Sequence, residues 1–111
     1  MITVKVTYTV KPDYVSKNRE NIALFMKDFK ELKTIDFQYA VYLSSDGKTF
    51  VHQSVYKNEK IQQQVLNMES FKEFQKQRDE SGLEAEPQID VMTLVDSTRE
   101  ILISEEPTIL F

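Results

Sequence analysis

Apolar and polar residues alternate along the first ten positions of the chain. From Ile2 to Val10 every second side chain is apolar or aromatic, and three threonines and one lysine lie between them. A period of two, rich in β-branched residues, is typical of a strand with one buried face. Pro12 ends the pattern because proline has no N–H to donate to a sheet. We therefore predict a first strand over residues 2–10.

The spacing of apolar residues then changes to intervals of three, four and seven between residues 14 and 33, with lysines and glutamates on the other side. This spacing predicts an amphipathic helix with one stripe facing the core. The apolar positions of the stripe are Val15, Ile22, Phe25, Phe29 and Leu32.

Strict alternation returns in two runs, residues 34–43 and Thr49 to Tyr56, on either side of Ser44-Ser45-Asp46-Gly47. Glycine tolerates the positive φ that a tight turn requires. The two runs are therefore predicted to form an antiparallel hairpin of the second and third strands.

A second helical region follows the hairpin. Asn58 is placed to cap its start. The sequence Ser70-Phe71-Lys72-Glu73 has the pattern of a capping box, in which Ser70 and Glu73 bond each other's backbone N–H groups. A capping box inside a helical stretch predicts a break near residues 67–69. We expect two short helices, the second ending at Gly82, and a fourth strand over Ile89–Val95.

The predicted order of elements is β-α-β-β-α-β. This order is typical of the ferredoxin-like α+β fold, an antiparallel sheet with its helices on one face. A chain of 111 residues has room for one such domain. We assign residues 1–96 to the domain and residues 97–111 to a C-terminal tail with several large apolar side chains.

Helices on one side leave the other face of the sheet without cover. On the register that we expect, the covered face carries Ile2, Val4, Val6, Tyr8, Phe37, Tyr39 and Val41, and the open face carries Ala40, Tyr42, Phe50, His52, Ser54, Tyr56, Met92 and Leu94. Monomers rarely expose so large an apolar patch. We therefore predict a homodimer through this face, with the tail packing on the partner and the polar side chains lining a cavity.

His52 is the only histidine, and an imidazole titrates near neutrality, so it is the candidate group for proton transfer. Tyr42, Ser54 and Tyr56 are the candidates to line a pocket beside it. The alternative is a structural histidine, hydrogen-bonded at the dimer interface or half exposed on the sheet. A Ser54–His52 nucleophile pair has less support, because no carboxylate is placed to orient the ring.

Composition excludes several kinds of site. The absence of cysteine excludes thiolate metal ligands and disulfides, and one histidine leaves only carboxylates for a metal, so no metal and no cofactor are predicted. A net charge of −4 argues against a nucleic-acid partner, although RNA-recognition modules share the βαββαβ order. The N-terminal segment has no long apolar run, so we expect neither a secretion signal nor a membrane partner, and a cytoplasmic location.

The run from Thr49 to Phe74 resembles the second half of the antibiotic biosynthesis monooxygenase family. A strand ends in the aromatic Tyr56, a charged turn follows, a helix opens on Ile61, and a short break precedes Ser-Phe-x-x-Phe at residues 70–74. Lys11-Pro12 after the first strand and Tyr39 in the second also fit, so the similarity spans residues 2–95.

This resemblance implies a homodimer whose two sheets form an α+β barrel, with a pocket between sheet and helices in each subunit. Some members oxidise aromatic polyketides without metal or flavin, and others degrade haem. This chain has Gln53, Val55 and Gln64 where the family often has glutamate, tryptophan and histidine, and it has no tryptophan at all. A haem-degrading role is therefore not expected.

Two functions are compatible with these residues. The first is a cofactor-free monooxygenase-like activity on a small aromatic or quinone-like molecule, in which His52 and the tyrosines hold or deprotonate a phenol. The second is a non-catalytic dimeric module that binds a ligand or has a structural role, which the departures from the family pattern favour.

Overall fold

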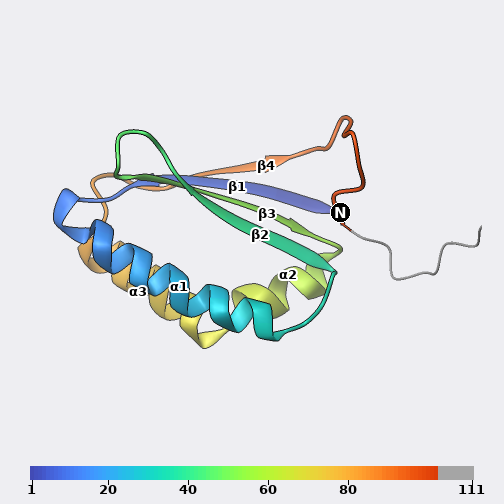
Figure 1. Cartoon of the computed structure of the whole chain (residues 1–111), viewed down its shortest axis with the longest axis horizontal. Helices are drawn as coiled ribbons and strands as arrows, with labels where there is room; N and C mark the ends of the chain where they lie inside the picture. The colour runs from blue at the N-terminus through green and yellow to red at the C-terminus, as the bar shows by residue number, and fades with distance from the viewer. Residues whose placement is uncertain (103–111) are drawn as a thin grey trace, which may run out of the picture.

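The computed structural model describes residues 1–102, a four-stranded sheet with three helices packed on one face (Figure 1). A short 3₁₀ turn at Pro12–Tyr14 precedes the first helix. The strands are β1 (Ile2–Thr9), β2 (Phe37–Leu43), β3 (Thr49–Tyr56) and β4 (Gln88–Met92), and the helices are α1 (Val15–Glu31), α2 (Glu59–Leu66) and α3 (Glu69–Ser81).

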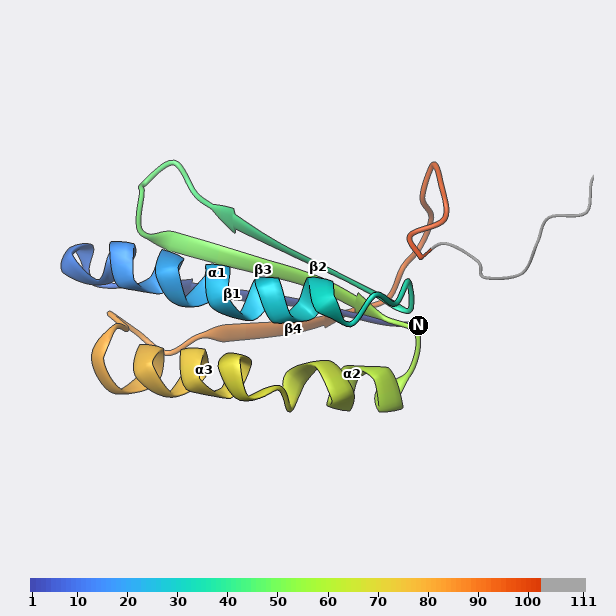
Figure 2. The ribbon, with the colours of Figure 1, turned by 60° about the horizontal axis from the view of Figure 1, so that its bottom comes forward.

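The strand order across the sheet is β2-β3-β1-β4, and every neighbouring pair is antiparallel. The helix α1 connects β1 to β2, and the α2–α3 pair connects β3 to β4. Figure 2 shows α1 and the α2–α3 pair lying side by side across the same face of the sheet. This arrangement confirms the predicted ferredoxin-like α+β fold.

The strand β3 turns toward the helices the face that was predicted to be open. In the observed register Val6 pairs with His52 and Tyr8 with Phe50, so these residues share one face of the sheet. Phe50, His52, Ser54 and Tyr56 therefore lie on the helix-covered face, and their exposed fractions are between 1% and 5%. The prediction failed because both faces of this strand mix polar and apolar residues, and a shift of one residue reverses every side chain.

Aromatic rings fill the space between sheet and helices. Phe25 of α1 has no exposed surface, and its ring centroid lies 4.9–5.1 Å from those of Phe29, Phe71 and Phe74. Burial of one such side chain contributes about 1.5–3 kcal/mol relative to its exposure to water. This aromatic cluster joins α1 to α3 and holds both helices against β3.

The second helical region is broken as predicted, with α2 ending at Leu66 and α3 beginning at Glu69. The Oδ1 atom of Asn58 accepts a hydrogen bond from the Ile61 N–H at 3.0 Å, which confirms the predicted cap. The predicted capping box is wrong. The helix begins two residues earlier than a Ser70 cap would require, its N-cap is Met68, and the Ser70 hydroxyl lies buried inside the first turn.

Gly82 ends α3 as predicted, but its role is close packing. Its φ is −113°, so no left-handed conformation requires glycine there. A Cβ atom at this position would lie 2.5 Å from Cδ2 of the Tyr14 ring. The glycine therefore lets the end of α3 approach the turn that precedes α1. In the β2–β3 hairpin, by contrast, Gly47 has the predicted positive φ, 77°.

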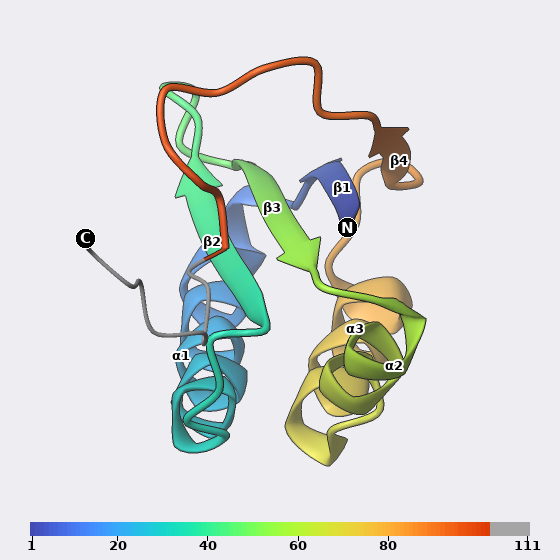
Figure 3. The ribbon, with the colours of Figure 1, turned by 90° about the vertical axis from the view of Figure 1, so that its right-hand side faces the viewer.

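The last strand is shorter than predicted, ending at Met92 instead of Val95. Met92 pairs with Thr3, near the start of β1, so residues beyond Met92 have almost no β1 backbone left to pair with. The following segment crosses the helix-free face of the sheet from β4 toward β2 (Figure 3). The predicted packing of the tail on a partner falls largely on residues 103–111, which lie outside the described residues.

Candidate functional site

Two pockets lie on opposite faces of the sheet. The inner pocket, about 480 Å³, lies between the sheet, α3 and the start of β4, and contains His52. The outer pocket, about 380 Å³, lies on the helix-free face. The inner pocket is lined by Val6, Tyr39, His52, Phe71, Phe74, Gln75, Arg78, Asp79, Leu83, Glu86, Pro87 and Ile89.

The His52 side chain is held by two tyrosines. Its Nε2 atom lies 2.7 Å from the Tyr8 hydroxyl oxygen, and its Nδ1 atom lies 2.7 Å from the hydroxyl oxygen of Tyr39. The Asn18 amide of α1 donates to the Tyr8 hydroxyl at 2.9 Å. These four side chains, Asn18, Tyr8, His52 and Tyr39, form the inner polar chain. It extends from α1 through the two central strands to β2.

Burial keeps the members of this chain neutral. Desolvation by burial, with a smaller contribution from the positive charge of the nearby Arg78 guanidinium, lowers the pKa of His52 to about 3. Desolvation likewise raises the pKa of the Tyr8 and Tyr39 hydroxyls well above their usual range. A neutral imidazole has one donor and one acceptor nitrogen, so one tyrosine donates to the ring and the other accepts from it.

Aromatic rings surround the imidazole on the pocket side. Its ring stacks on Phe74 with a centroid distance of 5.5 Å and an interplanar angle of 28°. Tyr39 meets the imidazole edge to face at 5.6 Å. Phe71 of α3 adds a further ring to the lining. These walls suit a flat apolar ligand, because offset and edge-to-face ring contacts are favourable.

Arg78 of α3 brings a positive charge into the inner pocket. Its side chain is 7% exposed, and its guanidinium carbon lies 4.8 Å from the Tyr8 ring centroid and 5.2 Å from that of Phe74. Both contacts are cation–π interactions. The Nε and Nη2 atoms each lie 3.0 Å from Oδ1 of the neighbouring Asp79. A cationic hydrogen-bond donor therefore borders the same space as His52.

The structure separates the four residues proposed from the sequence. His52 lines the inner pocket, whereas Tyr42 is 56% exposed on the opposite face of the sheet. Tyr56 is 1% exposed and belongs to the hydrophobic core. Ser54 is 5% exposed on the same face of β3 as His52, and no hydrogen bond joins the two within residues 1–102; it contributes to the lining of the outer pocket, as Tyr42 does. Tyr42 is therefore too distant in the fold to share a ligand with His52.

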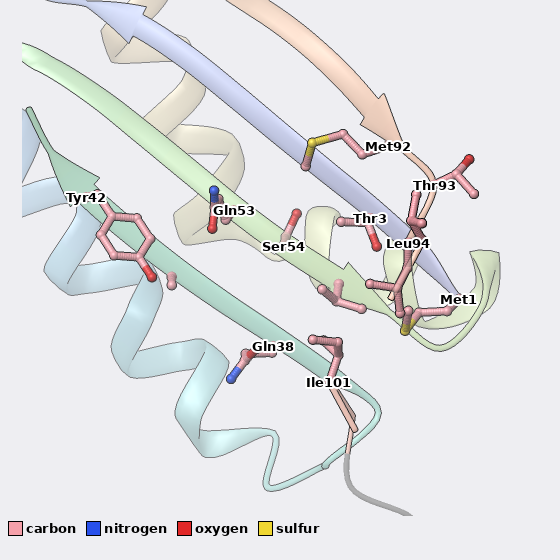
Figure 4. Close-up of a pocket in the computed structure, with 13 residues that line it drawn as sticks. Met1, Thr3, Gln38, Tyr42, Gln53, Ser54, Met92, Thr93, Leu94 and Ile101 are labelled. Carbon is pink, nitrogen blue, oxygen red and sulfur yellow. The ribbon is translucent and has the colours of Figure 1, made fainter. Parts of the chain in front are cut away.

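The outer pocket offers a different chemistry. Figure 4 shows Tyr42, Gln38 and Gln53 on the sheet, with Met92, Leu94 and Ile101 around them. The segment that follows β4 supplies several of these apolar side chains. The lining contains hydroxyls, amides and apolar groups, and no charged side chain of residues 1–102 is part of it.

Sequence reasoning missed the partners of His52 because it placed His52 on the other face. Asn18 and Arg78 nevertheless had a detectable signal. Asn18 lies three residues after Val15 in the α1 stripe, and Arg78 lies four residues after Phe74 in α3. A polar residue at a core position of an amphipathic helix is expected to have a specific partner.

No group of three His, Asp or Glu side chains that could hold a metal ion occurs in the described part of the chain. No helix among residues 1–102 is long and apolar enough to cross a membrane.

Known proteins resemble this chain in fold. The sequence matches no protein-family model and no curated protein. Solved structures match almost the whole domain. An antibiotic biosynthesis monooxygenase structure superposes with a TM-score of 0.73 and 11% identity, covering 86% of this chain and 100% of the other.

Two further solved structures show the same likeness. A conserved protein from Methanosarcina mazei has a TM-score of 0.68 and 22% identity, covering 82% of this chain and 89% of that one. A mutant of SnoaB, a cofactor-independent oxygenase from Streptomyces nogalater, has a TM-score of 0.67 and 13% identity, covering 89% of this chain and 97% of that one. The chain therefore has the fold of the antibiotic biosynthesis monooxygenases, as the sequence resemblance predicted.

Proposed function

We propose that the protein binds a small phenolic or quinone-like molecule in the inner pocket and oxidises it with O₂ without a cofactor. The observation that supports this proposal is the pairing of His52 with Tyr39 at the wall of a pocket whose other walls are aromatic. SnoaB, whose fold is similar, is described as a cofactor-independent oxygenase.

The chemistry requires an electron-rich substrate. A phenol whose ring system also carries a CH₂ group loses a proton, and the resulting anion donates electrons to O₂ directly. One oxygen atom becomes a carbonyl oxygen at that carbon, and the other leaves as water with the two hydrogens of the CH₂ group. In this proposal the His52–Tyr39 pair hydrogen-bonds the substrate oxygen and holds or accepts its proton.

A second function, a non-catalytic ligand-binding or structural module, is favoured by a different observation. Both ring nitrogens of His52 already have partners, and its pKa is lowered to about 3, so the imidazole is a weak base before any ligand enters. In this case the inner polar chain only orders the core and shapes the pocket.

Oxygen uptake with a panel of phenols and hydroquinones tests the proposal, with His52→Ala and the milder His52→Gln beside the wild type. We expect uptake by the wild type and a loss of about 100-fold or more in both variants. Absence of turnover by the wild type on every compound would contradict the oxygenase function. Equal turnover in wild type and variants would remove His52 from the reaction.

We also propose a homodimer formed through the helix-free face. Tyr42, Met92 and Leu94 on this face are 39–56% exposed in the single chain, and a second copy would cover them. Light scattering at micromolar concentration tests this, since a mass of one chain would contradict it. The cytoplasmic location and the boundary between residues 1–96 and a tail of 97–111 stay predictions from the sequence.

A further inference from the structure

Arg78 is the one cationic side chain among the described residues that line the inner pocket. Lysines elsewhere on α3, such as Lys76, are exposed to water. Burial of a guanidinium is costly unless acceptors satisfy it, so a buried arginine beside a cavity needs a specific reason. Packing alone does not supply that reason, because an apolar side chain would fill the same space without the cost.

The contacts of Arg78 leave part of its hydrogen-bonding capacity free. A guanidinium has five N–H donors. The contacts with Asp79 use Nε and Nη2, while the Tyr8 and Phe74 rings pack near the guanidinium carbon. Asp79 is itself 55% exposed, so water weakens its attraction for the guanidinium. Arg78 lines the inner pocket, so a donor that Asp79 does not use is available to an acceptor there.

The other groups around the cavity determine the charge of a suitable ligand. His52 and Tyr39 are neutral at physiological pH and offer hydrogen bonds, whereas the carboxylates of Asp79 and Glu86 belong to the lining near the loop before β4. Arg78 is therefore the group that favours negative charge on a ligand, and the aromatic rings beside it favour a planar one.

We infer that the inner pocket binds its phenolic ligand as the phenolate, with the ionised oxygen held by Arg78. This inference rests on the proposed function, because it takes the inner pocket as the place of an aromatic ligand. Its consequence is that the guanidinium promotes ionisation of the bound phenol electrostatically. The proton can then pass to the His52–Tyr39 pair or leave to solvent, so the weakly basic imidazole is sufficient.

Binding of 4-nitrophenol tests this inference without any turnover. Its neutral and ionised forms have different absorption spectra, so its pKa can be measured free and bound to the full-length protein. Nitrobenzene is the matched neutral probe. An opposite charge within a few ångströms lowers the pKa of an acid by about one unit or more. We expect the pKa of bound 4-nitrophenol to fall by about one unit, a roughly tenfold preference for the anion.

Four variants separate the charge of Arg78 from general effects. Arg78→Gln should abolish the shift while nitrobenzene still binds, and Arg78→Lys should retain part of it. Asp79→Asn removes the competing carboxylate and should enlarge the shift, a gain that misfolding cannot produce. Lys76→Gln removes one positive charge from the same helix outside the pocket and should leave the shift unchanged. Circular dichroism of each variant confirms that it folds.

The outcomes distinguish this inference from the proposed function. If both probes bind and the pKa of bound 4-nitrophenol is unshifted, or if Arg78→Gln keeps the full shift, the inference is overturned and the aromatic pocket stands. If neither probe binds, both are overturned. A shift that depends on Arg78, without oxygen uptake on any phenol, supports the inference and assigns the pocket to the non-catalytic binding module.

Discussion

The two faces of the sheet use similar side chains in different ways. On the inner face, a histidine, a serine and two tyrosines (His52, Ser54, Tyr8 and Tyr56) are at most 5% exposed, and a hydrogen bond links His52 to Tyr8. On the outer face, Tyr42 is 56% exposed and stands beside the amides of Gln38 and Gln53. The two faces differ in whether hydrogen-bond partners are present. A polar side chain can be buried where another group is placed to form a hydrogen bond with it.

This difference makes the residues of the inner face dependent on one another. In the inner polar chain, loss of one side chain leaves its neighbours buried without partners, which costs more than the bond itself contributed. The outer-face residues can turn to water instead. Matched substitutions on the two faces should therefore have unequal effects on the free energy of unfolding.

The largest difference is expected between adjacent positions on β3. Phe50→Ala removes a ring that is 2% exposed under the helices and should lower the free energy of unfolding by about 3–5 kcal/mol. Val51→Ala, on the outer face, should cost about 1 kcal/mol or less. Urea denaturation measures both. Equal losses, or a larger loss for Val51, would mean that the observed register is wrong.

A second pair of variants compares tyrosine hydroxyls. Tyr8→Phe removes the hydroxyl that joins His52 to Asn18 and leaves two buried groups unpaired, so a loss of about 3 kcal/mol is expected. Tyr42→Phe on the outer face should change stability by less than about 0.5 kcal/mol. Both are measured by denaturant unfolding at pH 7. A neutral Tyr8→Phe would show that the inner polar chain contributes nothing to folding.

The elements and their order could be predicted from the sequence because each has a local cause. The alternation in residues 2–10, the turn glycine Gly47 and the cap Asn58 each act within a few residues of their position. The break between α2 and α3 was also predicted, although the capping box on which it rested does not form.

The site could be predicted only in part, because it depends on pairing between distant residues. His52 was identified as a candidate, but its partners Tyr8 and Tyr39 are 44 and 13 residues away in the sequence. Both alternating sets of β3 contain apolar and polar members, so periodicity alone does not decide which set is buried. Only the register between β3 and β1 decides which set is buried, and that register depends on contacts between residues far apart in the sequence.

The buried histidine also predicts a dependence of stability on pH. The pKa of His52 is about 3 in the folded chain and about 6.5 when unfolded, so between these values the unfolded state binds more protons. Stability from this group is complete above pH 6.5 and is lost as pH falls. From pH 7 to pH 5 the loss should be about 2 kcal/mol.

Denaturant unfolding at a series of pH values measures this loss, and His52→Gln is the control. The variant has no imidazole to protonate, so its free energy of unfolding should be nearly constant over the same range, whatever its value at pH 7. A wild type that is equally stable at pH 5 and pH 7 would contradict the burial of a neutral His52.

The smallest effect on the stability of a single chain, but a clear effect on assembly, is expected from Tyr42→Lys. The side chain is exposed, so the fold should lose less than about 0.5 kcal/mol. In a two-fold dimer through the outer face, each interface would gain two lysines, which must be desolvated or repel each other.

Leu24→Lys, at a 60% exposed position of α1, is the matched control on the helix side. Light scattering should find single chains for Tyr42→Lys and dimers for Leu24→Lys. Dimers in both would place the interface elsewhere, and the outer face would then be open to water in the assembled protein as it is in the single chain.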